Sequence, residues 1–140
     1  MASTLQRLPV FAAALWWGSL TTIGFLVVPM LFAHLPSPAM AGGMAAHLFA
    51  AQTWVSVVCG VVLLLVYASK QALAPASRAQ IAIFFVVLGV LLAVLVELAV
   101  APRIVARENL KLWHAVGSAM YLVQWLSAAT VFWRVTAPSR

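Results

Sequence analysis

Long apolar stretches separated by short polar ones set the pattern of this chain. Four of them hold the roughly 20 apolar residues that a helix needs to cross the roughly 30 Å hydrocarbon core of a bilayer. They cover approximately residues 8–33, 43–68, 80–102 and 112–134. The segments between them contain the Pro, Gly, Ser and charged residues typical of turns. The pattern predicts an all-α, integral membrane four-helix bundle that forms a single transmembrane domain over residues 1–140.

The composition agrees with a membrane protein. Hydrophobic residues make up 66% of the chain and charged residues only 7%, whereas a soluble domain of this length needs far more polar surface. The formal net charge of +6 comes from basic residues that lie mostly at the ends of the apolar stretches, where they face lipid headgroups. We therefore expect the lipid bilayer as a partner and no nucleic acid. The one cysteine, Cys59, allows no intrachain disulfide.

The first apolar stretch begins after Arg7, and this basic start resembles that of a signal peptide. The apolar run is longer than the roughly 7 to 15 residues of a signal peptide core, and it contains Trp16 and Trp17. We therefore expect this stretch to be retained as the first membrane helix.

Basic residues are distributed unevenly between the two sides of the predicted bundle. Four crossings place both termini and the 69–79 connection on one side, which carries Arg7, Lys70, Arg78, Arg134 and Arg140. The opposite side carries Arg103, Arg107 and Lys111. The positive-inside rule then predicts cytoplasmic N- and C-termini.

Two features suggest that the bundle consists of two similar helical hairpins, although chance similarity is the alternative. Pro29 and Pro102 lie near the ends of the first and third stretches. In the second and fourth stretches a histidine is followed seven residues later by an aromatic residue, as His47 by Trp54 and His114 by Tyr121. Parallel repeats of this kind occur in membrane proteins. Each proline either bends its helix or ends it.

Small and polar residues recur at helical spacing and predict the faces through which the helices pack. These faces are Gly18, Thr22 and Pro29; Gln52, Ser56 and Gly60; Gly89, Ala93, Glu97 and Ala101; and His114, Ser118, Tyr121 and Trp125. At 100° per residue, His47 points away from Ser56. If His47 faces inward, the face with Ser56 must meet a neighbouring helix or another subunit.

Glu97 is one of only two acidic residues in the chain, and it lies inside an apolar run. Three interpretations are open. Glu97 hydrogen-bonds to His114 or Ser118 on the fourth helix and orders the bundle. Alternatively, His114, His47 and Glu97 form a metal or proton site suited to Zn or Cu, or the two histidines bracket a haem. In the third interpretation Glu97 reaches the headgroups or pairs with Arg103 or Arg107.

Three pieces of the sequence together resemble a known family. They are "LWWGSLTTIGFLVVPMLFAHL", "AGGMAAHLFAAQTWVSVVCGVVLLL" and "LWHAVGSAMYLVQWL". They are similar to the small bacterial four-helix membrane proteins grouped as domain of unknown function 4149, a family related to animal transmembrane protein 205. The resemblance implies a bacterial inner-membrane protein with no established reaction or ligand. It carries over onto Gly18, Pro29, Pro102 and Ser118, which we expect to be structural positions, and onto His114, but not onto Glu97 or His47.

No nucleophile with its base, phosphate loop or dinucleotide fingerprint occurs in the sequence. We therefore predict no catalytic residues and no cofactor. The expected role is a non-enzymatic structural, assembly or small-solute-handling component of the membrane that can form a homo-oligomer. The alternative is a metal- or haem-binding membrane protein that uses His114, His47 and Glu97.

Overall fold

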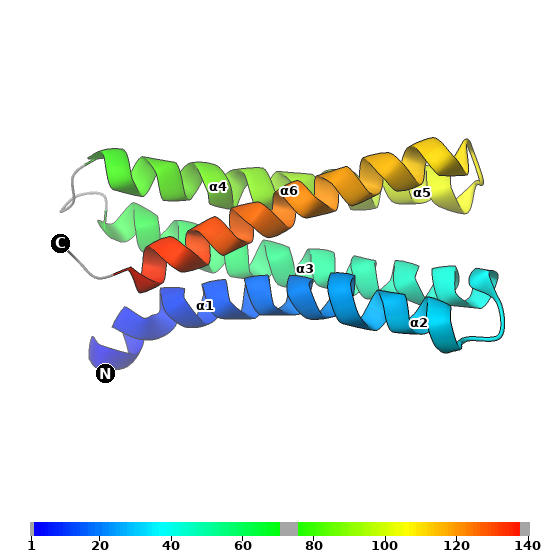
Figure 1. Cartoon of the computed structure of the whole chain (residues 1–140). Helices are drawn as coiled ribbons and strands as arrows, with labels where there is room; N and C mark the ends of the chain where they lie inside the picture. Colours follow the sequence, from blue (N-terminus) through cyan, green and yellow to red (C-terminus); the bar gives the residue numbers. More distant parts are fainter. Residues whose placement is uncertain (1, 71–75, 138–140) are drawn as a thin grey trace.

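The computed structural model describes residues 2–70 and 76–137, and these residues form a bundle of helices. Four long helical segments lie side by side and alternate in direction (Figure 1), so both ends of the described chain lie at the same end of the bundle. The predicted fold class, an all-α bundle of four helices able to span a membrane, is confirmed. Residues 71–75 of the expected 69–79 connection lie outside the described residues, as do Arg140 and the side chains of Lys70 and Arg78.

The four segments have the following elements. The first consists of α1 (Ala2–Thr22), η1 (Ile23–Val27) and α2 (Val28–His34), and the second is α3 (Pro38–Lys70). The third consists of α4 (Ala76–Leu95), η2 (Val96–Val100) and α5 (Ala101–Val105), and the fourth is α6 (Leu110–Thr136). The parts long and apolar enough to cross a membrane are Arg7–His34, Pro38–Ser69, Ala79–Val105 and Leu110–Thr136.

The second segment begins five residues before the predicted residue 43. Ser37 precedes the helix, and its Oγ accepts a hydrogen bond from the backbone N–H of Met40 at 3.3 Å. Pro38 follows in the first helical turn, where the missing N–H of proline has no cost. The pair of glycines, Gly42 and Gly43, therefore lies inside the helix and not in the preceding turn.

Each of the two prolines that were expected near helix ends lies just after a turn of π-helix. The wide turn begins six residues before the proline in both cases, at Ile23 for Pro29 and at Val96 for Pro102. A proline lacks the N–H for the regular helix ladder, and its ring collides with the carbonyl four residues earlier. A wider turn relieves this conflict and lets the helix continue. Neither proline therefore ends its helix, and the third segment continues three residues beyond the predicted end at 102.

The interior near the chain termini is apolar and involves all four segments. Its fully buried large side chains include Trp16, Leu20, Leu63, Val86 and Val131. Gly89 permits a close approach of α1 and α4, because a Cβ there would lie 2.7 Å from the Trp16 ring.

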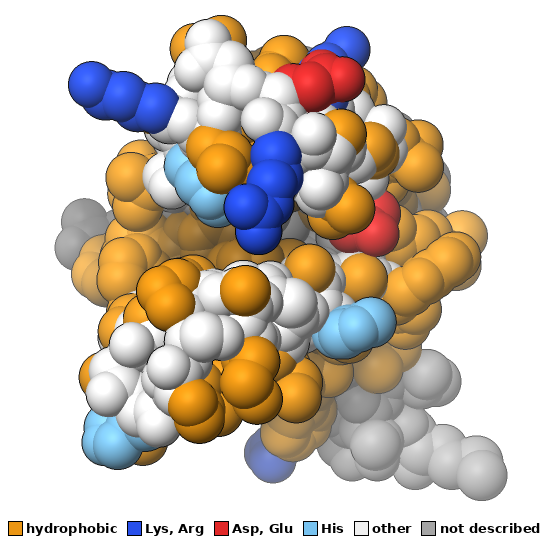
Figure 2. All heavy atoms as spheres, turned by 90° about the vertical axis from the view of Figure 1, so that its right-hand side faces the viewer, with side chains coloured by type: hydrophobic (Ala, Val, Ile, Leu, Met, Phe, Trp, Pro, Cys, Tyr) orange, Lys and Arg blue, Asp and Glu red, His pale blue; other side chains and the backbone are white. Residues whose placement is uncertain are grey.

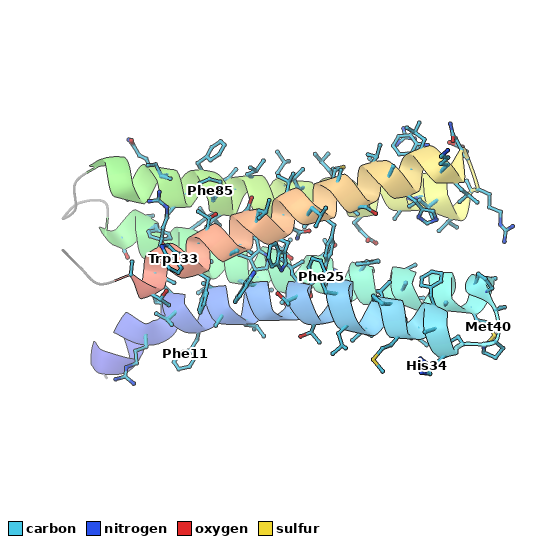
Figure 3. All side chains as sticks on the ribbon, in the orientation of Figure 1. Phe11, Phe25, His34, Met40, Phe85 and Trp133 are labelled. Carbon is cyan, nitrogen blue, oxygen red and sulfur yellow. The ribbon has the colours of Figure 1, made fainter. Side chains whose placement is uncertain are left out.

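The outer surface is apolar as well. Figure 3 shows Phe11 projecting from the outer side of α1, and Trp54 and Trp133 are 71% and 76% exposed. A bundle that is hydrophobic both inside and outside is suited to lipid.

Candidate functional site

The residues of the predicted metal or haem site lie near the end of the bundle that carries the connections at 35–37 and 106–109. Glu97 lies in η2 and is half-buried, whereas His47 on α3 and His114 on α6 are exposed. Figure 2 looks onto this end and shows the histidine side chains at separate places on it. Within residues 2–70 and 76–137, no three His, Cys, Asp or Glu side chains come together in a group that could hold a metal ion.

The carboxylate of Glu97 makes no hydrogen bond or salt bridge to any residue that the structure describes, so the expected bonds to His114 and Ser118 are not formed. Arg103, the basic residue closest in sequence to Glu97, interacts with other groups. The guanidinium of Arg103 lies 4.5 Å from the centre of the Trp113 ring, and its Nη1 donates to the carbonyl of Ala99. Arg103 thus joins α5 to the start of α6 through a cation–π contact.

The four positions expected to be structural lie mostly on outer faces. Pro29, Pro102 and Ser118 are exposed, and a Cβ at Gly18 would meet nothing within 4 Å. The glycine of the first segment that a neighbouring helix does approach is Gly24, where an added Cβ would overlap the Tyr121 ring of α6. Gly18 therefore allows no close helix contact within this bundle.

The orientation of α3 shows whether His47 or the face with Ser56 points into the bundle. His47 is exposed, whereas Gln52, Ser56 and Gly60 are buried against the other three segments. The expectation that this face meets another subunit depended on an inward His47, and the structure shows the opposite orientation.

A cluster of buried and half-buried polar side chains occupies the middle of the bundle. We define the polar cluster as Ser19, Gln52, Ser56 and Gln124. The Nε2 atom of Gln52 donates to Ser19 Oγ at 3.0 Å, and that of Gln124 donates to Ser56 Oγ at 3.0 Å. These bonds join α3 to α1 and α6. Gln52 and Gln124 are only 2% and 3% exposed.

Two aromatic side chains of α6 extend this polar contact to α1. Tyr121 Oη donates to the carbonyl of Leu20 at 2.7 Å, and Trp125 Nε1 donates to Thr21 Oγ1 at 2.9 Å. Both were expected on the inner face of the fourth helix, and both contact the first segment. The indole Nε1 atoms of Trp16 and Trp17 are buried without a hydrogen-bond partner among the described residues.

A small cavity lies beside the polar cluster. It is lined by Phe49, Gln52, Thr53, Ala93, Val96, Tyr121 and Gln124. It leaves about 10 Å³ for the centre of a water-sized molecule. The cavity lies beside η2, since Val96 is the first residue of that π-turn.

Sequence reasoning found part of this site. It grouped Gln52 with Ser56 on one face, but it did not single out Gln124, Ser19 or Thr21. The available signal was simple: Gln124 is an uncharged amide in an apolar span, and such a group requires a partner in a bilayer. Because the outer face of each helix is as apolar as the inner one, the pattern alone did not show which polar residues meet.

Comparison with known proteins places the chain in a family but gives it no activity. No curated protein and no solved structure matches the chain. A family described as "Domain of unknown function (DUF4149)" matches residues 11–112. The match includes Ser19, Gln52 and Ser56 and ends at the start of α6, before Tyr121 and Gln124. Because residues 11–112 are well over half of the chain, this four-helix multi-pass membrane protein belongs to the DUF4149 family.

Proposed function

We propose that this protein is a non-enzymatic structural or assembly component of the bacterial inner membrane. The observation that carries the proposal is the polar cluster, because its donors bind acceptors on neighbouring helices. In lipid, polar contacts of this kind hold helices together where hydrophobic contrast is missing. The cavity beside the cluster leaves about 10 Å³, which is room for one water and not for a passing solute.

The proposal includes cytoplasmic N- and C-termini. Its support is the count of basic residues on the two sides and the resemblance of the chain to bacterial inner-membrane proteins.

Association into a homo-oligomer is also part of the proposal. Ala115, Ser118 and Ala119 are exposed on the outer face of α6 and are small enough to let a second helix approach closely. The substitution Ser118→Leu should then shift protein in lipid nanodiscs toward the monomer in mass photometry, while Leu91→Ala on the outer face of α4 should not. If the unmodified protein is a monomer, the proposed homo-oligomer is contradicted, but the structural role is not.

Solute permeability of reconstituted vesicles tests the main proposal. Because the cavity beside the polar cluster is too small for a passing solute, vesicles that contain the protein should release glycerol and protons at the rate of protein-free vesicles. The control is a preparation with the same lipid and the same amount of an unrelated helical membrane protein. Faster release that depends on this protein would show a path and would contradict a purely structural role.

A further inference from the structure

Gln52 carries a buried hydrogen-bond acceptor and lies in the wall of the small cavity. The residue is 2% exposed, and its Oε1 has no hydrogen-bond partner among residues 2–70 and 76–137. Gln52 is also one of the residues that line the cavity. A buried acceptor without a partner is rare in a folded protein and points to a bound group.

The hydrogen bonds of the neighbouring serines fix the orientation of the Gln52 amide. Ser19 Oγ donates its proton to the carbonyl of Trp16, and Ser56 Oγ donates to the carbonyl of Gln52, both at 3.0 Å. A hydroxyl has one proton, so both serines are left with lone pairs only. They can therefore accept from Gln52 Nε2 but cannot donate to Oε1. Exchanging the oxygen and nitrogen of the amide would not remove the unpaired acceptor.

The other polar groups that line the cavity offer mainly lone pairs too. Thr53 Oγ1 donates to the carbonyl of Phe49 at 3.1 Å, and Tyr121 Oη donates to the carbonyl of Leu20 at 2.7 Å. Both hydroxyl protons are thus in use, while their lone pairs remain free. Gln124 Nε2 has two protons and uses one of them on Ser56 Oγ. The lining therefore consists of several acceptors and one available donor.

The geometry points to a binding site for one water molecule between α3, η2 and α6. A water needs roughly 10 to 15 Å³ for its centre and two to four polar partners, and the cavity offers about 10 Å³ with Gln52, Thr53, Tyr121 and Gln124 in its wall. The water donates to Gln52 Oε1 and to one of the two hydroxyl oxygens, and it accepts from Gln124 Nε2. It connects the second and fourth segments at the level of the π-turn.

Magnetisation transfer from water, measured by solid-state NMR on glutamine-labelled protein in lipid vesicles, tests this site. The side-chain amides of Gln52 and Gln124 should receive signal from water although both are buried in the bundle. Gln80, which is exposed near the start of α4, is the positive control. Transfer to Gln80 without transfer to Gln52 and Gln124 would overturn the proposal.

Two variants separate a bound water from other sources of signal. Ala93→Val adds two methyl groups to the cavity wall and should abolish the transfer to Gln52 and Gln124, whereas Ala46→Val on the outer face of α3 should leave it unchanged. Gln52→Leu removes the unpaired acceptor and should abolish the transfer to Gln124. If Ala93→Val does not fold, Gln52→Leu decides. Undiminished transfer in a folded Ala93→Val or Gln52→Leu protein would overturn the proposal.

Discussion

At the residue scale, the packing of the bundle interior depends on small residues at the points where two helices approach each other most closely. Gly89 is the clearest case. Its missing side chain leaves space for the Trp16 ring, which is completely buried. A larger residue at this position must displace an indole that is packed on all sides.

We therefore predict that Gly89→Ala lowers the free energy of unfolding by about 1 to 3 kcal/mol, the usual effect of overpacking a core. The measurement is reversible denaturation in mixed micelles. Gly18→Ala is the matched control, because a Cβ there meets nothing within 4 Å and alanine favours a helix by up to about 1 kcal/mol over glycine. Equal effects of the two substitutions would show that the Trp16 contact is unimportant.

The second prediction at this scale concerns His47, His114 and Glu97. Because both histidines are exposed and the Glu97 carboxylate binds neither of them, we expect purified protein to contain no stoichiometric Zn or Cu and no Soret absorbance. His114→Ala should leave elemental content and spectrum unchanged. A metal or haem that is present at one equivalent and lost in His114→Ala would support the alternative function.

At the element scale, capping sets the beginning of α3. Ser37 Oγ accepts from the Met40 N–H, and a cap of this kind contributes about 1 kcal/mol. Ser37→Ala should therefore speed hydrogen exchange of the Met40 amide by roughly five-fold. Ser69→Ala is a suitable control, since its hydroxyl only donates to the carbonyl of Val66. Unchanged exchange in Ser37→Ala would mean that the helix begins elsewhere.

The sequence predicted the elements well for a physical reason: a span must be continuously apolar, and that pattern is visible without any tertiary information. The ends of the spans were less accurate, because Gly42 and Gly43 indicate a turn as strongly as Ser37 and Pro38 indicate a helix start. The π-turns before Pro29 and Pro102 could not be predicted, since a proline is compatible both with a bent helix and with the end of a helix. Both helices continue past the proline because the wide turn before it relieves the conflict with the regular helix ladder.

The candidate site was harder to predict than the fold. The sequence pattern pointed to titratable residues, His47, His114 and Glu97, because their chemistry is easily recognised. The buried polar contacts instead use uncharged groups, Gln52 and Gln124, which can be buried without the large desolvation cost of a charge. Which polar groups meet depends on the rotation of each helix about its axis. Because a membrane helix is apolar on both sides, the sequence pattern does not determine that rotation.

At the scale of the whole molecule, the bundle has both ends of the described chain on one side (Figure 1). The proposed orientation predicts that a periplasm-dependent reporter, such as alkaline phosphatase, is inactive when fused after Arg140. The same reporter placed in the connection at 35–37 should be active. The opposite result for both fusions would reverse the orientation without affecting the fold.

The structural role itself depends on the contact between Gln124 and Ser56, which are buried partners on α6 and α3. The most direct test is a double-mutant cycle in mixed micelles with Gln124→Met, Ser56→Ala and the combined variant. Interhelical hydrogen bonds in membrane proteins average about 0.6 kcal/mol and reach about 1.7 kcal/mol. We predict a coupling energy in this range, and none when exposed Gln80→Met replaces Gln124→Met. Additive effects within about 0.3 kcal/mol would contradict the account that the polar cluster holds the bundle together.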